Sequence, residues 1–330
     1  MQIIIADTFG RELGFWEKER YLDVDIGSKD EFEIEISSKG WDQKRFNYGN
    51  QIFIPNTEYG GIIGDIKSLT KTSTIRMTGD TWRGMLAKKI IEPPTDQDYR
   101  KVSGELNTII GELISGQFDD LFMAASTNTG VYVQNYKFER YCTLLTGIED
   151  MLASVGYRIK IVYKEGDSGF SGWVEVEAVP IIDYSETEEF SQDSKVNFTV
   201  QDYRRGINHL ICAGTGEGAG RTVLHLYVQE DGSIGNTKYY TGLNERVALY
   251  SYTSQTDADK LREDGEKRLK EMMNYKEMEV TVEEVDLAVG DTVSGRDYVT
   301  GMVIQKPIIQ KILKIDGDKE SIEYKTKGDD

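Results

Sequence analysis

The stretch Glu31-Phe-Glu-Ile-Glu-Ile36 alternates strictly between acidic and apolar side chains. Successive side chains of a strand point to opposite faces of a sheet. The alternation therefore predicts a strand whose Phe32, Ile34 and Ile36 face a core while its three glutamates face solvent. One face of the sheet is expected to be buried and the other wet.

Further short strands are predicted on both sides of this stretch, and glycine-containing turns separate them. The predicted strands of the first quarter are 3–5, 21–26, 32–36, 52–54, 61–68 and 73–78. Their regular spacing favours an antiparallel barrel or sandwich. The chain is rich in Tyr, Val, Ile and Thr, and its 33 glycines against 5 prolines also favour strands joined by glycine turns.

A small helical layer is predicted to follow these strands. Three segments have helical patterns: 82–91, 102–114 and 142–155. Asp80 or Thr81 can cap the first helix, which Pro93-Pro94 ends. Ser103 is expected to cap the second, and Gly156 stands where a glycine would end the third.

The second half returns to strands and contains one charged helix over 258–275. Strands are predicted at 157–163, 173–182, 195–201, 208–213, 222–229, 235–240, 278–285, 292–293, 302–314 and 320–325. The predicted fold is α+β, mostly β, with two antiparallel β-barrel-like domains. We place the N-terminal one at 1–92, a helical or mixed connecting region at 93–156, and the C-terminal one at 157–330.

Composition and charge bound the class of protein. The 330 residues are 38% hydrophobic and 10% aromatic, which supports a folded chain large enough for two cores. The 39 basic and 57 acidic residues give a formal charge of −18, which repels a phosphate backbone. Specific nucleic-acid binding is therefore not expected.

The cysteines and the N-terminal segment indicate neither a disulfide scaffold nor a signal peptide. Cys142 and Cys212 are too few for a disulfide scaffold and are expected to be small buried hydrophobes. The segment 1–7 lacks a basic region and is predicted to be a first strand rather than a signal peptide. No apolar run approaches the roughly 20 residues that span a bilayer, so we expect a protein made in the cytoplasm.

Two local patterns suggest ligands but lack the required context. The glycine run 214–221 fits a loose dinucleotide-binding spacing, yet an alternating strand follows it instead of a helix, which predicts a hairpin connection. His209, Cys212 and His225 lie at strand positions with no fourth ligand to close a zinc site. We therefore predict no cofactor, no metal and no catalytic residues.

Acidic pairs and aromatic side chains leave two alternatives open. Glu175 and Glu177 have a spacing that could suggest a hydrolase, but their alternation with valines predicts a solvated strand face. The aromatic-rich segment 131–141 could stack on sugars, although core and subunit-interface packing account for it better. A cell-wall hydrolase and a carbohydrate-binding attachment module remain the alternative functions.

Five phrases in this sequence, taken together and in order, resemble the tail hub proteins of siphophages and Gram-positive prophages. They are Thr57-Glu-Tyr-Gly-Gly-Ile-Ile-Gly64, Gly79-Asp-Thr-Trp-Arg-Gly-Met-Leu86, Lys89-Ile-Ile-Glu-Pro-Pro94, Gln201-Asp-Tyr-Arg-Arg-Gly-Ile-Asn-His-Leu210 and Asp286-Leu-Ala-Val-Gly-Asp-Thr-Val293.

The resemblance implies a non-enzymatic structural subunit of the virion tail, assembled in the cytoplasm of the bacterial host. It implies two barrel-like domains that continue the tail tube wall, and a homotrimer whose ring has pseudo-sixfold symmetry. The implied partners are sister copies, tail tube proteins and tail-tip or spike proteins, with DNA passing through the ring. The negative charge adds the hypothesis that the ring's wall repels this DNA.

Overall fold

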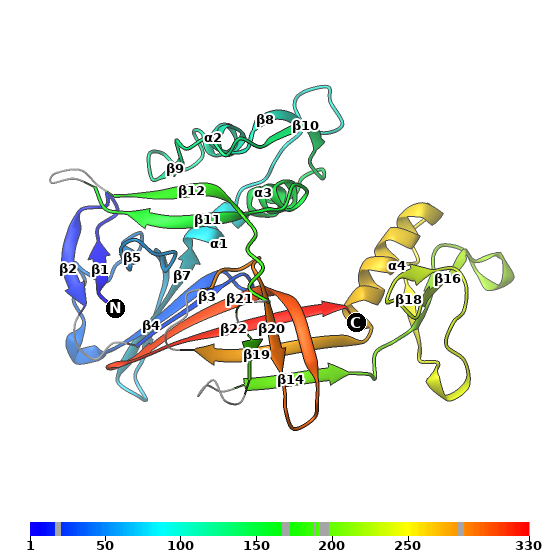
Figure 1. Cartoon of the computed structure of the whole chain (residues 1–330). Coiled ribbons are helices and arrows are strands. Elements are labelled where there is room, and N and C mark those ends of the chain that lie inside the picture. Colours follow the sequence, from blue (N-terminus) through cyan, green and yellow to red (C-terminus); the bar gives the residue numbers. More distant parts are fainter. Residues whose placement is uncertain are drawn as a thin grey trace. The chain divides into compact units, whose positions relative to one another are not determined.

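A computed structural model describes residues 1–16, 21–166, 172–185, 187, 189–191, 198–282 and 287–329 (Figure 1). The strands are β1 Ile3–Ala6, β2 Glu12–Trp16, β3 Tyr21–Ile26, β4 Glu31–Ser37, β5 Gln51–Phe53, β6 Gly60–Leu69, β7 Thr74–Thr81, β8 Lys101–Glu105, β9 Phe122–Ala124, β10 Tyr132–Lys137, β11 Tyr157–Lys164, β12 Trp173–Pro180, β13 Glu189–Phe190, β14 Phe198–Tyr203, β15 His209–Ala213, β16 Val223–Val228, β17 Ile234–Gly235, β18 Val247–Ser251, β19 Tyr275–Val282, β20 Thr292–Arg296, β21 Val303–Asp316 and β22 Lys319–Asp329. The α-helices are α1 Trp82–Ala87, α2 Leu106–Ile114, α3 Leu144–Ala153 and α4 Ala258–Met272. The predicted α+β, mostly β class is confirmed.

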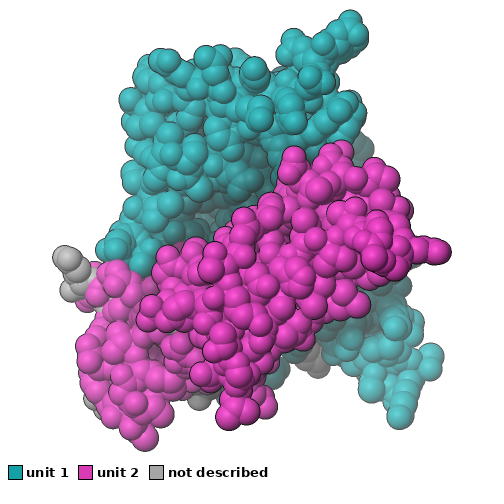
Figure 2. Space-filling model, turned by 90° about the vertical axis from the view of Figure 1, so that its right-hand side faces the viewer, with its two compact units in different colours: residues 1–184, 281–292, 308–324 teal, residues 185–280, 293–307, 325–330 magenta. Residues whose placement is uncertain are grey.

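The chain forms two compact units, which Figure 2 colours separately. Unit 1 comprises residues 1–184, 281–292 and 308–324, and unit 2 comprises 185–280, 293–307 and 325–330. Among the described residues, no helix has the length and apolar character needed to cross a membrane. The domain limits expected near residues 92 and 156 stay predictions.

The sheet strands that lie wholly or partly in unit 1 include the run β22-β21-β3-β4-β7-β6-β5-β1-β2, in that order. From β21 onward these strands pair antiparallel, with Leu22 opposite Ile34 and Ile34 opposite Met77. Phe32, Ile34 and Ile36 of β4 are all buried, whereas Glu31, the first residue of the strand, is exposed. The alternation in β4 therefore positions one apolar face, as the sequence predicts.

Two glycines let the backbone of this sheet pass close to the ring of Phe32. A Cβ on Gly79 would lie 1.9 Å from the carbonyl oxygen of Ile62 and 2.8 Å from Phe32 Cε1. A Cβ on Gly61 would lie 2.9 Å from the same ring carbon. All three distances are too short for a real Cβ atom, so Phe32 can be buried here only against glycine.

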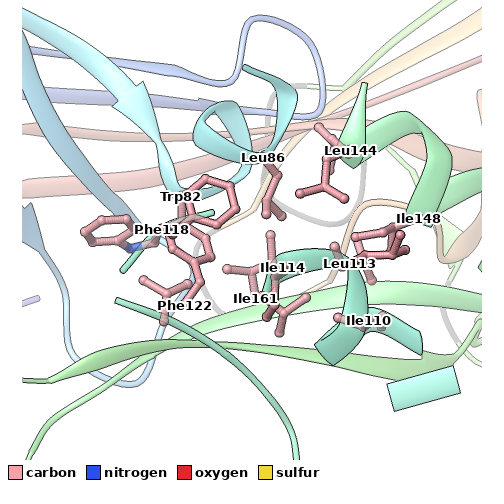
Figure 3. Close-up of a cluster of buried hydrophobic side chains, with 14 of the residues drawn as sticks. Trp82, Leu86, Ile110, Leu113, Ile114, Phe118, Phe122, Leu144, Ile148 and Ile161 are labelled. Atoms are coloured by element: carbon pink, nitrogen blue, oxygen red, sulfur yellow. The ribbon is translucent and has the colours of Figure 1, made fainter. Parts of the chain in front are cut away.

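A second cluster of buried side chains fills the space between the helices and strands β11 and β12 (Figure 3). Figure 3 shows these side chains pointing toward one another from α1, α2, α3 and β11. Its members include Trp82, Leu86, Ile110, Leu113, Ile114, Phe118, Phe122, Leu144, Ile148 and Ile161. The predicted helical layer is thus part of one core with the strands beside it.

The helices differ from the expected ones at their starts and ends. Residues 101–105 form β8, which pairs antiparallel with β10, so the expected Ser103 cap is wrong. The helix begins at Leu106 instead, because the Glu105 carboxylate accepts a hydrogen bond from the Thr108 N–H. The first helix ends at Ala87, earlier than the expected residue 91.

In unit 2, the strand order β17-β16-β15-β18 forms a small sheet with α4 packed on one side. Leu210, Cys212 and Leu226 of the sheet form a core with α4 residues Leu261 and Leu269. α4 can approach the sheet closely because residue 265 is a glycine. A Cβ at this position would lie only 2.4 Å from Cys212 Sγ. The remaining strand pairs of unit 2 include β14 with β19, antiparallel, and β13 with β20, parallel.

Candidate assembly surfaces

The segment from Gly79 to Leu86 connects β7 to α1 and fixes the helix against the β3–β4 turn. Thr81 is the N-cap: its Oγ1 accepts from the Gly84 N–H at 3.1 Å and donates to the Asp30 carbonyl oxygen at 2.9 Å. A Cβ on Gly84 would lie 2.2 Å from that same carbonyl oxygen. Thr81 and Gly84 are therefore required by the way α1 packs against the β3–β4 turn.

Arg83 is the buried centre of an ion network, with 2% of its surface exposed. Its Nε and Nη2 donate to Glu58 Oε1 at 3.0 and 2.8 Å, and its Nη1 donates to Glu149 Oε1 at 2.6 Å. Burial would lower the pKa of Arg83, but the two facing carboxylates outweigh it and raise the pKa above its usual value. One side chain thereby joins α1 to the loop before β6 and to α3.

A second ion pair, with a buried carboxylate, ties residues 287–292 to β11 of unit 1. Arg158 of β11 donates from Nε and Nη2 to the two oxygens of Asp291, at 2.7 and 3.0 Å. The Asp291 carboxylate is buried and also accepts from the Ile182 N–H at 2.9 Å. A bidentate pair of this kind fixes geometry as well as charge.

Glu105 holds the loop before β10 to the start of α2. Its carboxylate accepts from the N–H and hydroxyl of Thr129 at 2.8 and 2.7 Å, and from the N–H of Thr108 at 2.9 Å. Burial raises the pKa of Glu105, but these hydrogen bonds outweigh it and lower the pKa to about 2, from 4.5.

This shift predicts a pH dependence of stability. A lowered pKa in the folded state stabilises the fold above pH 4.5, and the contribution is lost as the pH falls from about 4.5 to about 2. Glu105→Gln should cost about 1–2 kcal/mol of unfolding free energy at pH 7, allowing for solvent screening. The difference from the unsubstituted chain should shrink toward pH 2, measured by urea unfolding at several pH values. The exposed Glu112→Gln is the control, and equal losses in both variants would refute the assignment.

Unit 1 exposes apolar side chains along the β1–β2 hairpin. Strand β2 lies at the end of the sheet order, where Leu13 and Phe15 are exposed, and Phe9 near the turn is 72% exposed. An edge strand with exposed apolar residues is a ready site for pairing with another chain. We call this surface, comprising Phe9, Leu13 and Phe15, the hairpin surface.

An open groove of about 880 Å3 lies next to the hairpin surface. Phe9, Phe118, Met123 and Trp173 line it, together with the neighbouring Lys89, whose Nζ lies 5.3 Å from the Phe118 ring centroid. Exposed Met123 and Phe9 leave apolar atoms available on its walls. The groove extends the apolar area of this side of unit 1.

Unit 2 exposes a different apolar surface on β18. Val247 and Leu249 are 48% and 65% exposed, and Leu243, just before the strand, is fully exposed. β18 is the last strand in its sheet order. We call Leu243, Val247 and Leu249 the β18 surface.

The glycine run 214–221 joins β15 to β16, which pair antiparallel, so the predicted hairpin is confirmed. Arg221 closes it: its Nε donates to the Gly214 carbonyl oxygen at 2.9 Å and its Nη2 to Ser251 Oγ at 2.7 Å. The connection is thus tied to the neighbouring β18 strand.

The three residues that were considered as zinc ligands lie on two different faces of their sheet. His209 and His225 lie together, with His209 Nε2 2.8 Å from His225 Nδ1. Cys212 faces α4 instead, where burial raises its pKa to about 11. Because side chains alternate along a strand, the cysteine is on the opposite face from the histidines.

The other singled-out residues have structural partners. Glu175 and Glu177 lie on β12 as predicted, where Lys164 and Lys160 form ion pairs with them at 3.5 and 3.3 Å. The aromatic segment 131–141 forms β10 and the chain after it, with ring contacts and a few exposed tyrosines.

No protein-family model matches this sequence, and no curated protein matches it. Solved structures do match. A tail protein from Neisseria meningitidis MC58 is 15% identical, with a TM-score of 0.51 over 100% of this chain and 97% of that one. A 43 kDa tail protein of prophage MuSo2 from Shewanella oneidensis is 13% identical, with a TM-score of 0.53 over 99% and 98%.

A chain of the phage P2 baseplate, in its activated conformation with Ca, is also similar. It is 9% identical, with a TM-score of 0.51 over 99% of this chain and 98% of that one. Identities this low carry information about the fold alone. Over nearly its entire length, this chain has the fold of phage and prophage tail proteins.

Proposed function

We propose that this chain is a non-enzymatic tail hub subunit, which forms a homotrimeric ring at the tail tip and connects the tail tube to tip or spike proteins. The observation that carries the proposal is the match to tail and baseplate proteins, which covers nearly all of this chain and of theirs. The ring would lie in the virion tail and would be assembled in the cytoplasm of the bacterial host. Its paired barrel-like domains would continue the tube wall.

The two apolar surfaces support ring formation. A closed ring is built from heterologous contacts, in which one surface of a subunit meets a different surface of the next. The hairpin surface lies in unit 1 and the β18 surface lies in unit 2. Each subunit therefore offers two different apolar surfaces for such contacts.

The charge supports a conduit for DNA. A formal charge of −18 disfavours lasting contact between the protein and a phosphate backbone, so DNA could pass without being held. A reconstruction of the ring with lysine and arginine side chains lining its opening would contradict this part of the proposal.

Light scattering on the purified chain tests the ring. The expected mass is about 112 kDa, three times the 37.4 kDa of one chain. Phe15→Glu and Leu249→Glu each place a charge in an apolar contact and should shift the mass toward the monomer. Lys71→Glu, at an exposed turn, changes the charge without touching either surface and should stay trimeric.

Two results would count against the proposal. A chain that remains monomeric at the highest soluble concentration would contradict ring formation. A trimer that both glutamate variants leave intact would show that these two surfaces are not its contacts.

A further inference from the structure

The sheet of unit 2 has one face covered by α4 and one face that carries both histidines of the chain. Figure 1 shows α4 beside β16 and β18. Leu210, Cys212 and Leu226 face α4, so their strand neighbours face the other way. His209 lies opposite Tyr227, two residues from His225, which places the two imidazoles as diagonal neighbours on this face.

The ring nitrogens of the two histidines are directed at each other. His209 Nε2 lies 2.8 Å from His225 Nδ1. His209 Nδ1 lies 2.7 Å from Glu245 Oε1, which also accepts from Lys238 Nζ at 2.7 Å. This ion pair places the Lys238 ammonium group against the Glu245 carboxylate, which therefore acts as a hydrogen-bond acceptor toward both neighbours.

Glu245 fixes the tautomer of His209. An ionised carboxylate can only accept, so His209 Nδ1 must carry the proton. In the neutral imidazole, Nε2 is then left with its lone pair, and this lone pair points toward His225. A histidine that donates one N–H to a carboxylate and offers its other nitrogen is the arrangement found around protein-bound metals.

We propose that His209 Nε2 and His225 Nδ1 bind one divalent transition-metal ion of the zinc, nickel or copper class, with Glu245 as a positioning residue. Imidazole nitrogen is a preferred ligand for these ions, whereas magnesium and calcium prefer oxygen. The buried His209 is held in place by Glu245, and the exposed His225 is the ligand that can adjust.

Binding requires a small local change. Two bonds of about 2.0–2.1 Å at a tetrahedral angle separate the nitrogens by about 3.4 Å, so the rings must part by roughly half an ångström. His225 must also carry its proton on Nε2, which frees the Nδ1 lone pair. Both changes involve the exposed ring, whose strand position leaves it room to turn.

One chain supplies only part of the coordination sphere. Within the described ranges, there is no group of three or more His, Cys, Asp or Glu side chains placed to hold a metal. The remaining positions would be taken by water or by a donor from another chain. We therefore expect the isolated chain to bind the metal ion, and a side chain from another chain would strengthen this binding.

Calorimetric titration of the full chain with ZnCl2 and with NiCl2 tests the site. We expect one ion per chain, loss of that binding in His225→Ala, and 10- to 100-fold weaker binding in Glu245→Gln. Glu217→Gln, on the exposed 214–221 connection, should bind like the unsubstituted chain. The far-UV spectrum and thermal unfolding of each variant establish that it is folded.

Nitrogen-15 spectra of the imidazoles provide a readout that a purely structural pair would not give. On adding Zn2+, His209 Nε2 and His225 Nδ1 should shift while His209 Nδ1 stays protonated. Absence of binding would overturn the proposal, and so would equal binding by His225→Ala, which would assign the ion to surface carboxylates. The measurement is independent of the mass of the particle, so failure of the ring would leave this result standing.

Discussion

Replacing Arg83 by methionine is expected to lower the unfolding free energy of unit 1 by about 3–5 kcal/mol. The substitution leaves Glu58 and Glu149 facing each other without the cation that lies between them. Burial already raises the pKa of Glu149, and Arg83 opposes that effect. Loss of Arg83 therefore removes the charge that offsets the desolvation of these carboxylates.

Arg76 offers a matched control for this substitution. It also pairs with two glutamates, Glu33 and Glu35, but on the wet face of the sheet with 42% of its side chain exposed. Exposed ion pairs contribute about 0–1 kcal/mol, so Arg76→Met should have little effect. Urea unfolding followed by tryptophan fluorescence measures both. Similar losses in the two variants would mean that burial does not set the strength of the Arg83 network.

Trp82→Ala is expected to destabilise unit 1 by about 3–5 kcal/mol. Trp82 is fully buried, its ring stacks on Tyr163 with centroids 5.6 Å apart, and it meets Phe122 edge-on at 6.4 Å. Removing the indole leaves a cavity between α1 and the strands that the fixed backbone around it cannot fill. The exposed Tyr48→Ala should change stability by less than about 0.5 kcal/mol.

Trp82→Phe distinguishes the contribution of the aromatic ring from that of the indole N–H group. In the described part of the chain, Trp82 Nε1 is buried with no hydrogen-bond acceptor. Phenylalanine keeps part of the aromatic volume and removes that N–H, so we expect less than half the loss seen with alanine. A phenylalanine variant as unstable as the alanine variant would contradict packing as the source of the effect.

The sequence predicts the individual helices and strands of this fold better than it predicts which strands pair with one another. Alternation in 31–36 and the helical stripe in 258–275 are local patterns, and both elements are present. Residues 102–105 belong to the segment 102–114 that has a helical pattern, but they pair with β10, about 30 residues away. Local pattern cannot foresee that pairing, because its energy comes from a strand elsewhere in the chain.

The partners of Arg83 could not be predicted from the sequence for a similar reason, and although both histidines were considered as ligands, their contact could not be predicted either. Arg83 looks like any helix arginine, and its partners lie 25 and 66 positions away. The two histidines are 16 residues apart, and only the register of β15 with β16 brings them together. Alternation did carry one useful signal, since it places Cys212 on the face opposite His209. The exposed residues of β18 gave no such signal, because apolar residues occur on both faces of that strand.

The pairing of β3 with residues 311–316 of β21 has a consequence for synthesis. When β3 leaves the ribosome, nearly 300 residues remain to be made before its second neighbour exists, roughly 15–60 s at about 5–20 residues per second. For that interval one side of the nascent sheet has unpaired N–H and C=O groups. Asp23 and Asp25 on β3 place negative charge along that edge. This charge repels the β3 strands of other nascent chains that are being made on the same messenger RNA.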